Sequence, residues 1–183
     1  MSKDFFYYTK EHILEKNRLK RLWQHWLHPR QRVERYFPTA DLQRISDEIG
    51  VSEQSHQGQI RFVIESRYDS TAVLQGLDTR TRAWQWFGEL GVWNTEHNSG
   101  VLVYISFADH AVEIVADRGI AAKVADGQWQ AVCQNMLGSF KQAQFVEGLE
   151  LGLRQISEIL VDNLPRHEPG SSEDELPNEI ILR

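Results

Sequence analysis

Three short segments have the polar and apolar patterns of β-strands. Apolar and polar residues alternate in residues 59–66, while residues 101–106 form a nearly continuous apolar run that is typical of a strand buried on both faces. A second β-rich run, residues 111–116, follows after only four residues, 107–110. Four residues are enough for a hairpin but too few for a parallel crossover, so we expect the last two strands to pair antiparallel.

Apolar residues at intervals of three and four predict helices in the rest of the chain. The predicted helices span residues 9–28, 39–49 (with Thr39 as N-cap), 79–90, 126–140 (with Asp126 as N-cap) and 143–161. Gly148 and Gly152 lie one turn apart in the last of them and allow a neighbouring element to approach closely. The order helix-helix-strand-helix-strand-strand-helix-helix predicts a single α/β domain with a small mixed sheet covered by helices.

The ends of the chain differ from this domain. After Pro165 the sequence has too few apolar residues to order itself, so we expect residues 165–183 to form a disordered acidic tail. Residues 1–10 lack the features of a signal peptide, and the longest purely apolar run, residues 101–105, is far shorter than the ~20 residues that span a bilayer. We therefore expect a cytoplasmic protein without an integral membrane segment.

Charge is distributed unevenly along the chain. Residues 1–37 contain nine Lys or Arg against four Asp or Glu, a net charge of +5, whereas the remaining residues carry −11. Trp23 and Trp26 lie among these basic residues. Residues 5–37 are therefore interpreted in three ways: a helix packed on the domain, a segment that contacts an anionic membrane surface, or a contact for a partner such as a membrane-associated protein. Nucleic acid is not an expected partner, because the rest of the chain is acidic.

Most of the residue types that carry chemistry have a structural interpretation. Cys133 cannot form an internal disulfide because it is the only cysteine, and its place on an apolar helix face predicts a buried thiol. The seven histidines are scattered and are expected at the surface. No nucleotide-binding loop, metalloprotease motif or serine-hydrolase elbow occurs, so the catalytic residues, if there are any, are unknown.

Oxygen-bearing side chains flank the two apolar strands of the predicted hairpin. Asn94, Glu96 and Asn98 precede it, and Asp117 and Arg118 follow it. Hard divalent cations bind carboxylate, amide and carbonyl oxygens that loops present, so the first four residues form a candidate metal site, and Arg118 is a candidate phosphate ligand. The alternative is that the Asn and Asp residues only serve turn geometry.

The same region resembles a known family. Residues 100–105 (GVLVYI) and 112–119 (VEIVADRG), together with Trp129 and the segment 140–148, are similar to the TPM domain family, sometimes labelled the TPM phosphatase domain. The resemblance covers roughly residues 38–163 and is closest to the short, soluble bacterial members.

This resemblance implies a three-layer α/β/α sandwich, here residues 38–164, preceded by the N-terminal helical extension 1–37. For parts of the family it also implies binding of a divalent cation such as Ca²⁺ or Mg²⁺ and an acid phosphatase activity. Two positions depart from the related soluble members: Asn94 stands where they usually have Asp, and His110 stands where they usually have Arg. Both changes remove a charge that a metal or a phosphate would favour.

Two functions follow from these expectations. The first is a non-catalytic binding or accessory module that works beside membrane-associated partners and has a divalent cation as its candidate ligand. The alternative is a metal-dependent acid phosphatase that acts on a small phosphoester.

Overall fold

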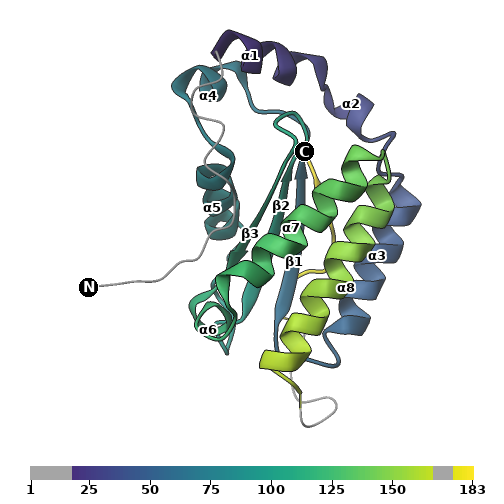
Figure 1. Cartoon of the computed structure of the whole chain (residues 1–183), viewed down its shortest axis with the longest axis vertical. Coiled ribbons are helices and arrows are strands. Elements are labelled where there is room, and N and C mark those ends of the chain that lie inside the picture. The colour runs from purple at the N-terminus through teal and green to yellow at the C-terminus, as the bar shows by residue number, and fades with distance from the viewer. Residues whose placement is uncertain (1–17, 167–174) are drawn as a thin grey trace.

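A mixed sheet of four strands forms the middle layer of the protein (Figure 1). The structure is a computed structural model that describes residues 18–166 and 175–183. The strands are β1 (Gln59–Glu65), β2 (Gly100–Ser106), β3 (Ala111–Ala116) and β4 (Ile181–Leu182), in the order β3-β2-β1-β4. Strand β2 is parallel to β1 and antiparallel to β3, which confirms the predicted hairpin and the predicted mixed sheet.

Helices cover both faces of this sheet (Figure 1), and the three-layer α/β/α sandwich is confirmed. One face carries α3 (Thr39–Ser52), α7 (Asp126–Lys141) and α8 (Phe145–Asn163). The opposite face carries α5 (Thr79–Glu89). The shorter helices are α1 (Arg18–Leu27), α2 (Arg30–Val33), α4 (Ser70–Gln75) and α6 (Arg118–Ala121). Helices α1 and α4 lie beyond the carboxyl end of β1, and α6 lies at the opposite end of the sheet (Figure 1).

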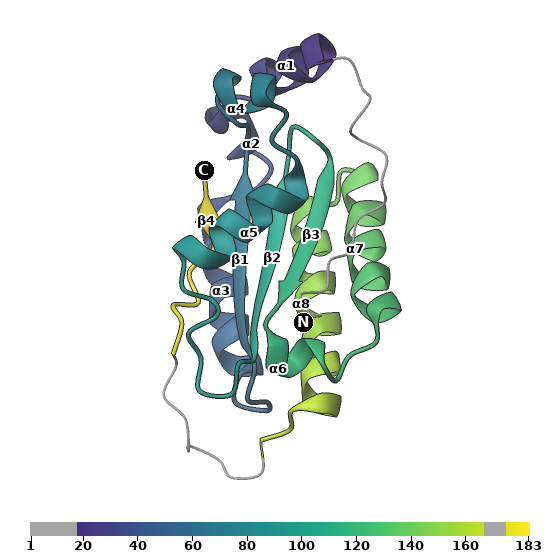
Figure 2. The same ribbon diagram turned by 90° about the vertical axis from the view of Figure 1, so that its left-hand side faces the viewer.

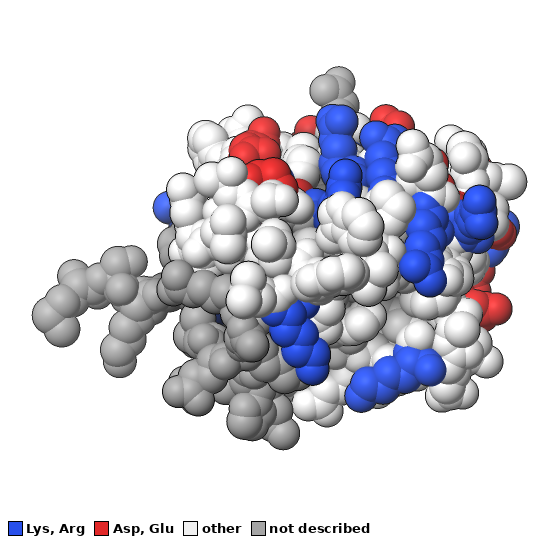
Figure 3. All heavy atoms as spheres, turned by 90° about the horizontal axis from the view of Figure 1, so that it is seen from above, with Lys and Arg blue, Asp and Glu red and all other residues white. Residues whose placement is uncertain are grey.

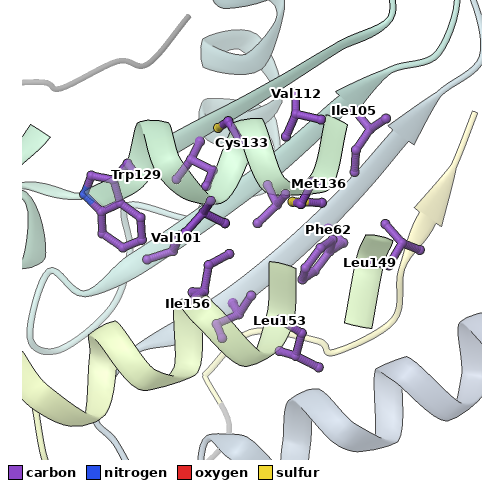
Figure 4. Packing of buried hydrophobic residues seen from close by; sticks show 14 of the residues in the cluster. Phe62, Val101, Ile105, Val112, Trp129, Cys133, Met136, Leu149, Leu153 and Ile156 are labelled. Atoms are coloured by element: carbon purple, nitrogen blue, oxygen red, sulfur yellow. The ribbon is translucent and has the colours of Figure 1, made fainter. Parts of the chain in front are cut away.

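The central strand β2 is buried along its whole length, as its apolar run predicts. Alternate residues belong to different layers: Val101 and Val103 pack with α7 and α8, while Leu102 and Tyr104 pack with α5. Figure 4 shows the first of these clusters, where Met136 lies between the sheet and the two helices. Because both faces of β2 are covered by helices, the hairpin is held rigidly inside the protein.

Glycines let α8 approach α7 closely, as the sequence predicts. A Cβ atom on Gly152 would lie 2.5 Å from Sδ of Met136, and one on Gly148 would collide with the ring of Phe140. The predicted N-caps are each one residue off, since α3 is capped at Pro38 and α7 at Ala125. Helix ends commonly differ by one or two residues from the expected position, because the terminal turns fray.

The C-terminal residues correct the prediction of a disordered tail. Residues 175–183 are ordered, with Leu176 and Ile180 only 6% exposed. Strand β4 pairs with β1 in parallel at Val63–Ile181 and occupies the edge beside it (Figure 2). The segment is polar on average, but the apolar run at its end, residues 180–182, covers the otherwise unpaired edge of β1. Residues 167–174 and residues 1–17, which include the start of the predicted first helix, lie outside the described residues.

Within the described ranges, no helix has the length and apolar character needed to cross a membrane.

Candidate functional site

Two turns that are distant in the sequence meet beside α6. Strands β1 and β2 start at this end of the sheet and β3 ends there, so the backbone N–H of Asp117 donates to the carbonyl of Gly100 at 2.8 Å. The N–H of Gly119 donates to the carbonyl of Asn98 at 2.9 Å. A side chain at Gly119 has no room, because its Cβ would lie 2.6 Å from that carbonyl oxygen and would also collide with the carbonyl of His97. The two turns are therefore locked against each other.

Asp117 is the buried carboxylate of this junction, with only 3% of the residue exposed. Its Oδ1 accepts a hydrogen bond from the backbone N–H of Arg118 at 2.7 Å and caps α6. Its Oδ2 is buried and has no hydrogen-bond partner in the described part of the chain. Burial raises the pKa of Asp117, opposed by the N–H and the charge of Arg118. A buried carboxylate oxygen without a donor is costly, and a bound cation would remove that cost.

Asn98 and Arg118 complete the junction. Asn98 has a φ of 50°, a left-handed conformation that Asn tolerates better than most residues. Its Oδ1 accepts a hydrogen bond from Nε of Arg118 at 2.9 Å. Arg118 is itself exposed, and its hydrogen bond to Asn98 holds its guanidinium at the surface of this junction.

The other two predicted metal ligands have no side-chain hydrogen bond to this junction among the described residues. Asn94 and Glu96 are exposed in the preceding loop. The N–H of Glu96 donates to Oε2 of Glu175 at 2.8 Å, and no hydrogen bond between described residues links either side chain to Asp117. In residues 18–166 and 175–183, no three His, Cys, Asp or Glu side chains are grouped so that they could hold a metal ion. Among the predicted site residues, hydrogen bonds in the described part of the chain link Asn98, Asp117 and Arg118.

A buried polar cluster at the opposite end of the sheet was not predicted as a unit. Asp109, in the β2–β3 turn, accepts hydrogen bonds from Nε and Nη2 of Arg21 at 2.7 and 2.9 Å. It also lies 3.2 Å from Nε2 of His25, whose Nδ1 accepts from the backbone N–H of Tyr68 at 2.9 Å. Because Nδ1 is an acceptor, Nε2 carries a proton and donates to Asp109. Burial alone would raise the pKa of Asp109, but the hydrogen bonds from Arg21 and His25 and the charge of Arg21 outweigh it and hold the pKa well below its usual range.

This cluster shows how the basic N-terminal segment meets the acidic domain. The described part of that segment packs on the domain in two ways: Val33 and Phe37 are buried in the hydrophobic core, whereas α1 is held mainly through the polar groups of this cluster. The expectation that the histidines lie at the surface is wrong for two of them, since His25 is 2% and His56 is 0% exposed. Asp109, in the hairpin turn of an otherwise apolar region, was the one sign of this cluster in the sequence, but nothing in the sequence paired it with Arg21.

A second buried carboxylate, Glu65, ends β1 and is fully engaged. It accepts hydrogen bonds from Nε and Nη2 of Arg82, from the indole N–H of Trp86 at 3.0 Å and from the hydroxyl of Tyr104 at 2.7 Å. Burial, with the neighbouring Tyr68 and Glu65, raises the pKa of Tyr104 well above its ordinary value, so its hydroxyl stays protonated and can donate. With four donors around it, Glu65 stabilises the fold and offers no free oxygen to a cation.

The comparisons with known proteins identify the family. The family profile of the TPM domain matches residues 32–159. The chain belongs to the TPM domain family. The TPM domain here is similar to the NMR structure of the BA42 protein from the psychrophilic bacterium Bizionia argentinensis, with a TM-score of 0.69 and 31% identity over 79% of this chain and 94% of that chain. None of the curated proteins matches the chain.

Asn94 and His110, the two positions that we expect to differ from related soluble members, make no hydrogen bond to Asp117 among the described residues. His110 is in the β2–β3 turn, with a φ of 52° and its ring 5.9 Å from that of His28. Strand β3 separates it from Asp117, because residues 111–116 run between the two ends of the sheet. Asn94 is on the exposed part of the loop. Neither substitution therefore changes the buried carboxylate at the junction.

Proposed function

We propose that this TPM-domain protein is a non-catalytic accessory module that binds a divalent cation at the junction of the Asn98 and Asp117 turns. The observation that carries the proposal is the buried Oδ2 of Asp117, which has no hydrogen-bond donor among the described residues. A module of this kind would work beside membrane-associated partners. The support for this second part of the proposal comes from helix α1, at the opposite end of the sheet (Figure 1).

The donor types at the junction favour Ca²⁺ or Mg²⁺ over softer metals. Asp117 supplies a carboxylate, Asn98 supplies an amide oxygen, and the carbonyls of His97 and Asn98 face Gly119. These are hard oxygen ligands, and the sulfur and imidazole groups that select zinc or copper are not part of this set. A bound cation would neutralise the Asp117 carboxylate and tie the two turns together, while Asn98 would exchange its hydrogen bond to Arg118 for the cation.

Thermal unfolding in the presence of each cation tests this proposal. A ligand at ten times its Kd stabilises the native state by about 1.4 kcal/mol, which raises the Tm of a domain of this size by about 3–6 °C. We expect this rise with CaCl₂ or MgCl₂ up to about 10 mM, tenfold above the ~1 mM Kd of weak calcium modules. The Asp117→Asn variant keeps the cap acceptor but loses the charge, and it should lose the rise.

Asp47→Asn is the matched control, because Asp47 is an exposed carboxylate on α3. It should keep the cation-dependent rise in Tm. The proposal is wrong if the unmodified protein shows no rise with any of Ca²⁺, Mg²⁺ and Mn²⁺, or if Asp117→Asn retains the full rise.

The position of Arg118 favours one alternative, a metal-dependent phosphatase. A guanidinium next to a cation site is the arrangement that could bind the oxygens of a phosphoester. Turnover of an aryl phosphate between pH 4 and 8, with and without cation, separates the two functions. The accessory module predicts no turnover above the buffer rate. Cation-dependent turnover that both Asp117→Asn and Arg118→Gln abolish would replace the accessory module with the phosphatase.

A further inference from the structure

Helix α1 packs on the domain with its polar side. Arg21 and His25, which lie one turn apart, are 7% and 2% exposed and both bind Asp109. In Figure 1 the helix lies across the end of the molecule beyond β1 and β2. An amphipathic helix that only covers a core turns its apolar side inward, so α1 is oriented in the opposite way.

The apolar side of α1 faces outward. Leu19, Trp23, Trp26 and Leu27 are 65%, 62%, 67% and 45% exposed. Leu19, Trp23 and Leu27 follow one another at intervals of four residues, and Trp26 is three residues after Trp23, so all of them lie on a single face of the helix. The rings of Trp23 and Trp26 contact each other edge to face, with centroids 5.5 Å apart. Scattered single apolar residues at a surface are ordinary, but a continuous stripe with two tryptophans indicates an interaction surface.

Basic side chains surround this stripe, which we call the α1 face (Leu19, Trp23, Trp26 and Leu27). Arg67 lines an open cavity of about 250 Å³ together with Trp23, Trp26 and Tyr68. The exposed basic residues on α1 and beyond its C-terminal end are Lys20, Arg30, Arg32 and Arg35. Seen from above, Lys and Arg side chains lie around an uncharged area, with acidic side chains mainly toward its edges (Figure 3).

We propose that the α1 face is a docking surface for an anionic lipid bilayer. Tryptophan and leucine insert at the boundary between headgroups and acyl chains, and Lys and Arg around them bind the lipid phosphates. A second copy of the chain is a poorer match, because two α1 faces would bring their basic rims together. The polar side of α1 supports the same geometry: the buried ion pair to Asp109 holds the helix flat on the domain and leaves its apolar side free to insert.

Each Lys or Arg at an anionic surface contributes enough attraction that losing two of them weakens binding by about 30-fold. The Lys20→Gln/Arg67→Gln double variant should show this loss. The Trp23→Ser/Trp26→Ser variant should bind at least about 10-fold more weakly, because it removes both interfacial anchors. Both pairs of side chains lie on the exposed part of the helix or line an open cavity, and an unchanged Tm verifies that each variant is folded.

Co-sedimentation of the full chain with vesicles tests the proposal. We expect binding to phosphatidylcholine vesicles that contain about 30% phosphatidylglycerol, little binding to pure phosphatidylcholine, and release at about 0.5 M salt, where charges are screened. Trp93→Ser is the matched control, since Trp93 is also 55% exposed but belongs to the loop before β2, at the other end of the sheet. That variant should bind like the unmodified protein. EDTA in every sample keeps the result independent of the proposed cation site.

Three outcomes would overturn the proposal. The unmodified protein could remain in the supernatant with anionic vesicles at low salt. It could bind equally well after Trp23→Ser/Trp26→Ser, which would assign the membrane affinity to another part of the chain, such as residues 1–17. Finally, sedimentation velocity could show a dimer that the same substitutions dissociate, which would make the α1 face an interface between two copies.

Discussion

Replacing Asp109 by Asn tests whether the buried ion pair holds α1 on the domain. Asp109 accepts two hydrogen bonds from Arg21, one from His25, and one from the Ser106 hydroxyl at 3.0 Å. The Arg21 and Asp109 side chains are only 9% and 2% exposed. The Asp109→Asn variant therefore leaves the Arg21 guanidinium buried beside a neutral amide, which can satisfy only some of its donors.

The expected loss of stability in the Asp109→Asn variant follows from the cost of burying the Arg21 charge without a partner. Removing one member of a buried ion pair destabilises a protein by about 3–5 kcal/mol. Since α1 lies near one end of the described chain, it can swing away and return Arg21 to water, so we expect the lower end of this range, about 3 kcal/mol. Hydrogen exchange of the amides in residues 18–27 should then become at least about 100-fold faster.

A double-mutant cycle with Arg21→Gln gives the decisive measurement. The cycle compares the free energies of unfolding of the two single variants and the double variant. The coupling free energy between the two positions should reach about 2 kcal/mol or more, as for contacting residues in one network. Glu48→Gln is the control, because Glu48 forms an exposed pair with Arg44 on α3 and should cost less than about 1 kcal/mol. Unchanged exchange in residues 18–27, or additive effects of the two substitutions, would refute the reasoning.

The low pKa of Asp109 gives the same interaction a pH dependence. A carboxyl group whose pKa is lower in the folded than in the unfolded state contributes stability above its unfolded value, about 3.9. This contribution is lost as the pH falls below that value. Acid should therefore release α1, and Asp109→Asn should remove the corresponding part of the acid sensitivity.

Three further predictions concern the core. Burial lowers the pKa of His56 from 6.5 to about 4, so the unfolded chain binds more protons between these values. The free energy of unfolding should therefore fall by about 3 kcal/mol from pH 6.5 to pH 4, and His56→Asn should flatten this slope in urea titrations. Gly152→Ala should destabilise the protein by about 1–3 kcal/mol, because the added Cβ clashes with Met136. Gly138→Ala in α7 should stabilise it by about 0.5–1 kcal/mol, because a Cβ there meets nothing within 4 Å. Thermal unfolding distinguishes the two variants. Burial raises the pKa of Cys133, so its thiol should react with a disulfide reagent only at the rate of unfolding, and rapid labelling of the native protein would contradict this.

The candidate site shows where sequence reasoning succeeded and where it stopped. The four-residue connection correctly predicted an antiparallel hairpin, and this pairing brings Asp117 back to Gly100. The sequence could not rank the four candidate metal ligands, because loop residues at similar sequence distances differ greatly in burial. Asn94 and Glu96 are exposed while Asp117 is buried, and that difference depends on how the loop packs.

The sequence by itself determined strands β1 to β3, the main helices, the hairpin and the α/β class, because hydrophobic periodicity and short connections depend on local geometry. Only the tertiary structure decided three other features: the seating of the C-terminal residues on the free edge of β1, the isolation of a buried Asp117 oxygen, and the orientation of α1. The last is the clearest case. The pattern of α1 showed an apolar side and a polar side, and the usual rule would bury the apolar one. Asp109, 88 residues from Arg21 in the sequence, pairs with the polar side instead, and an ion pair between such distant residues is visible only once the chain has folded.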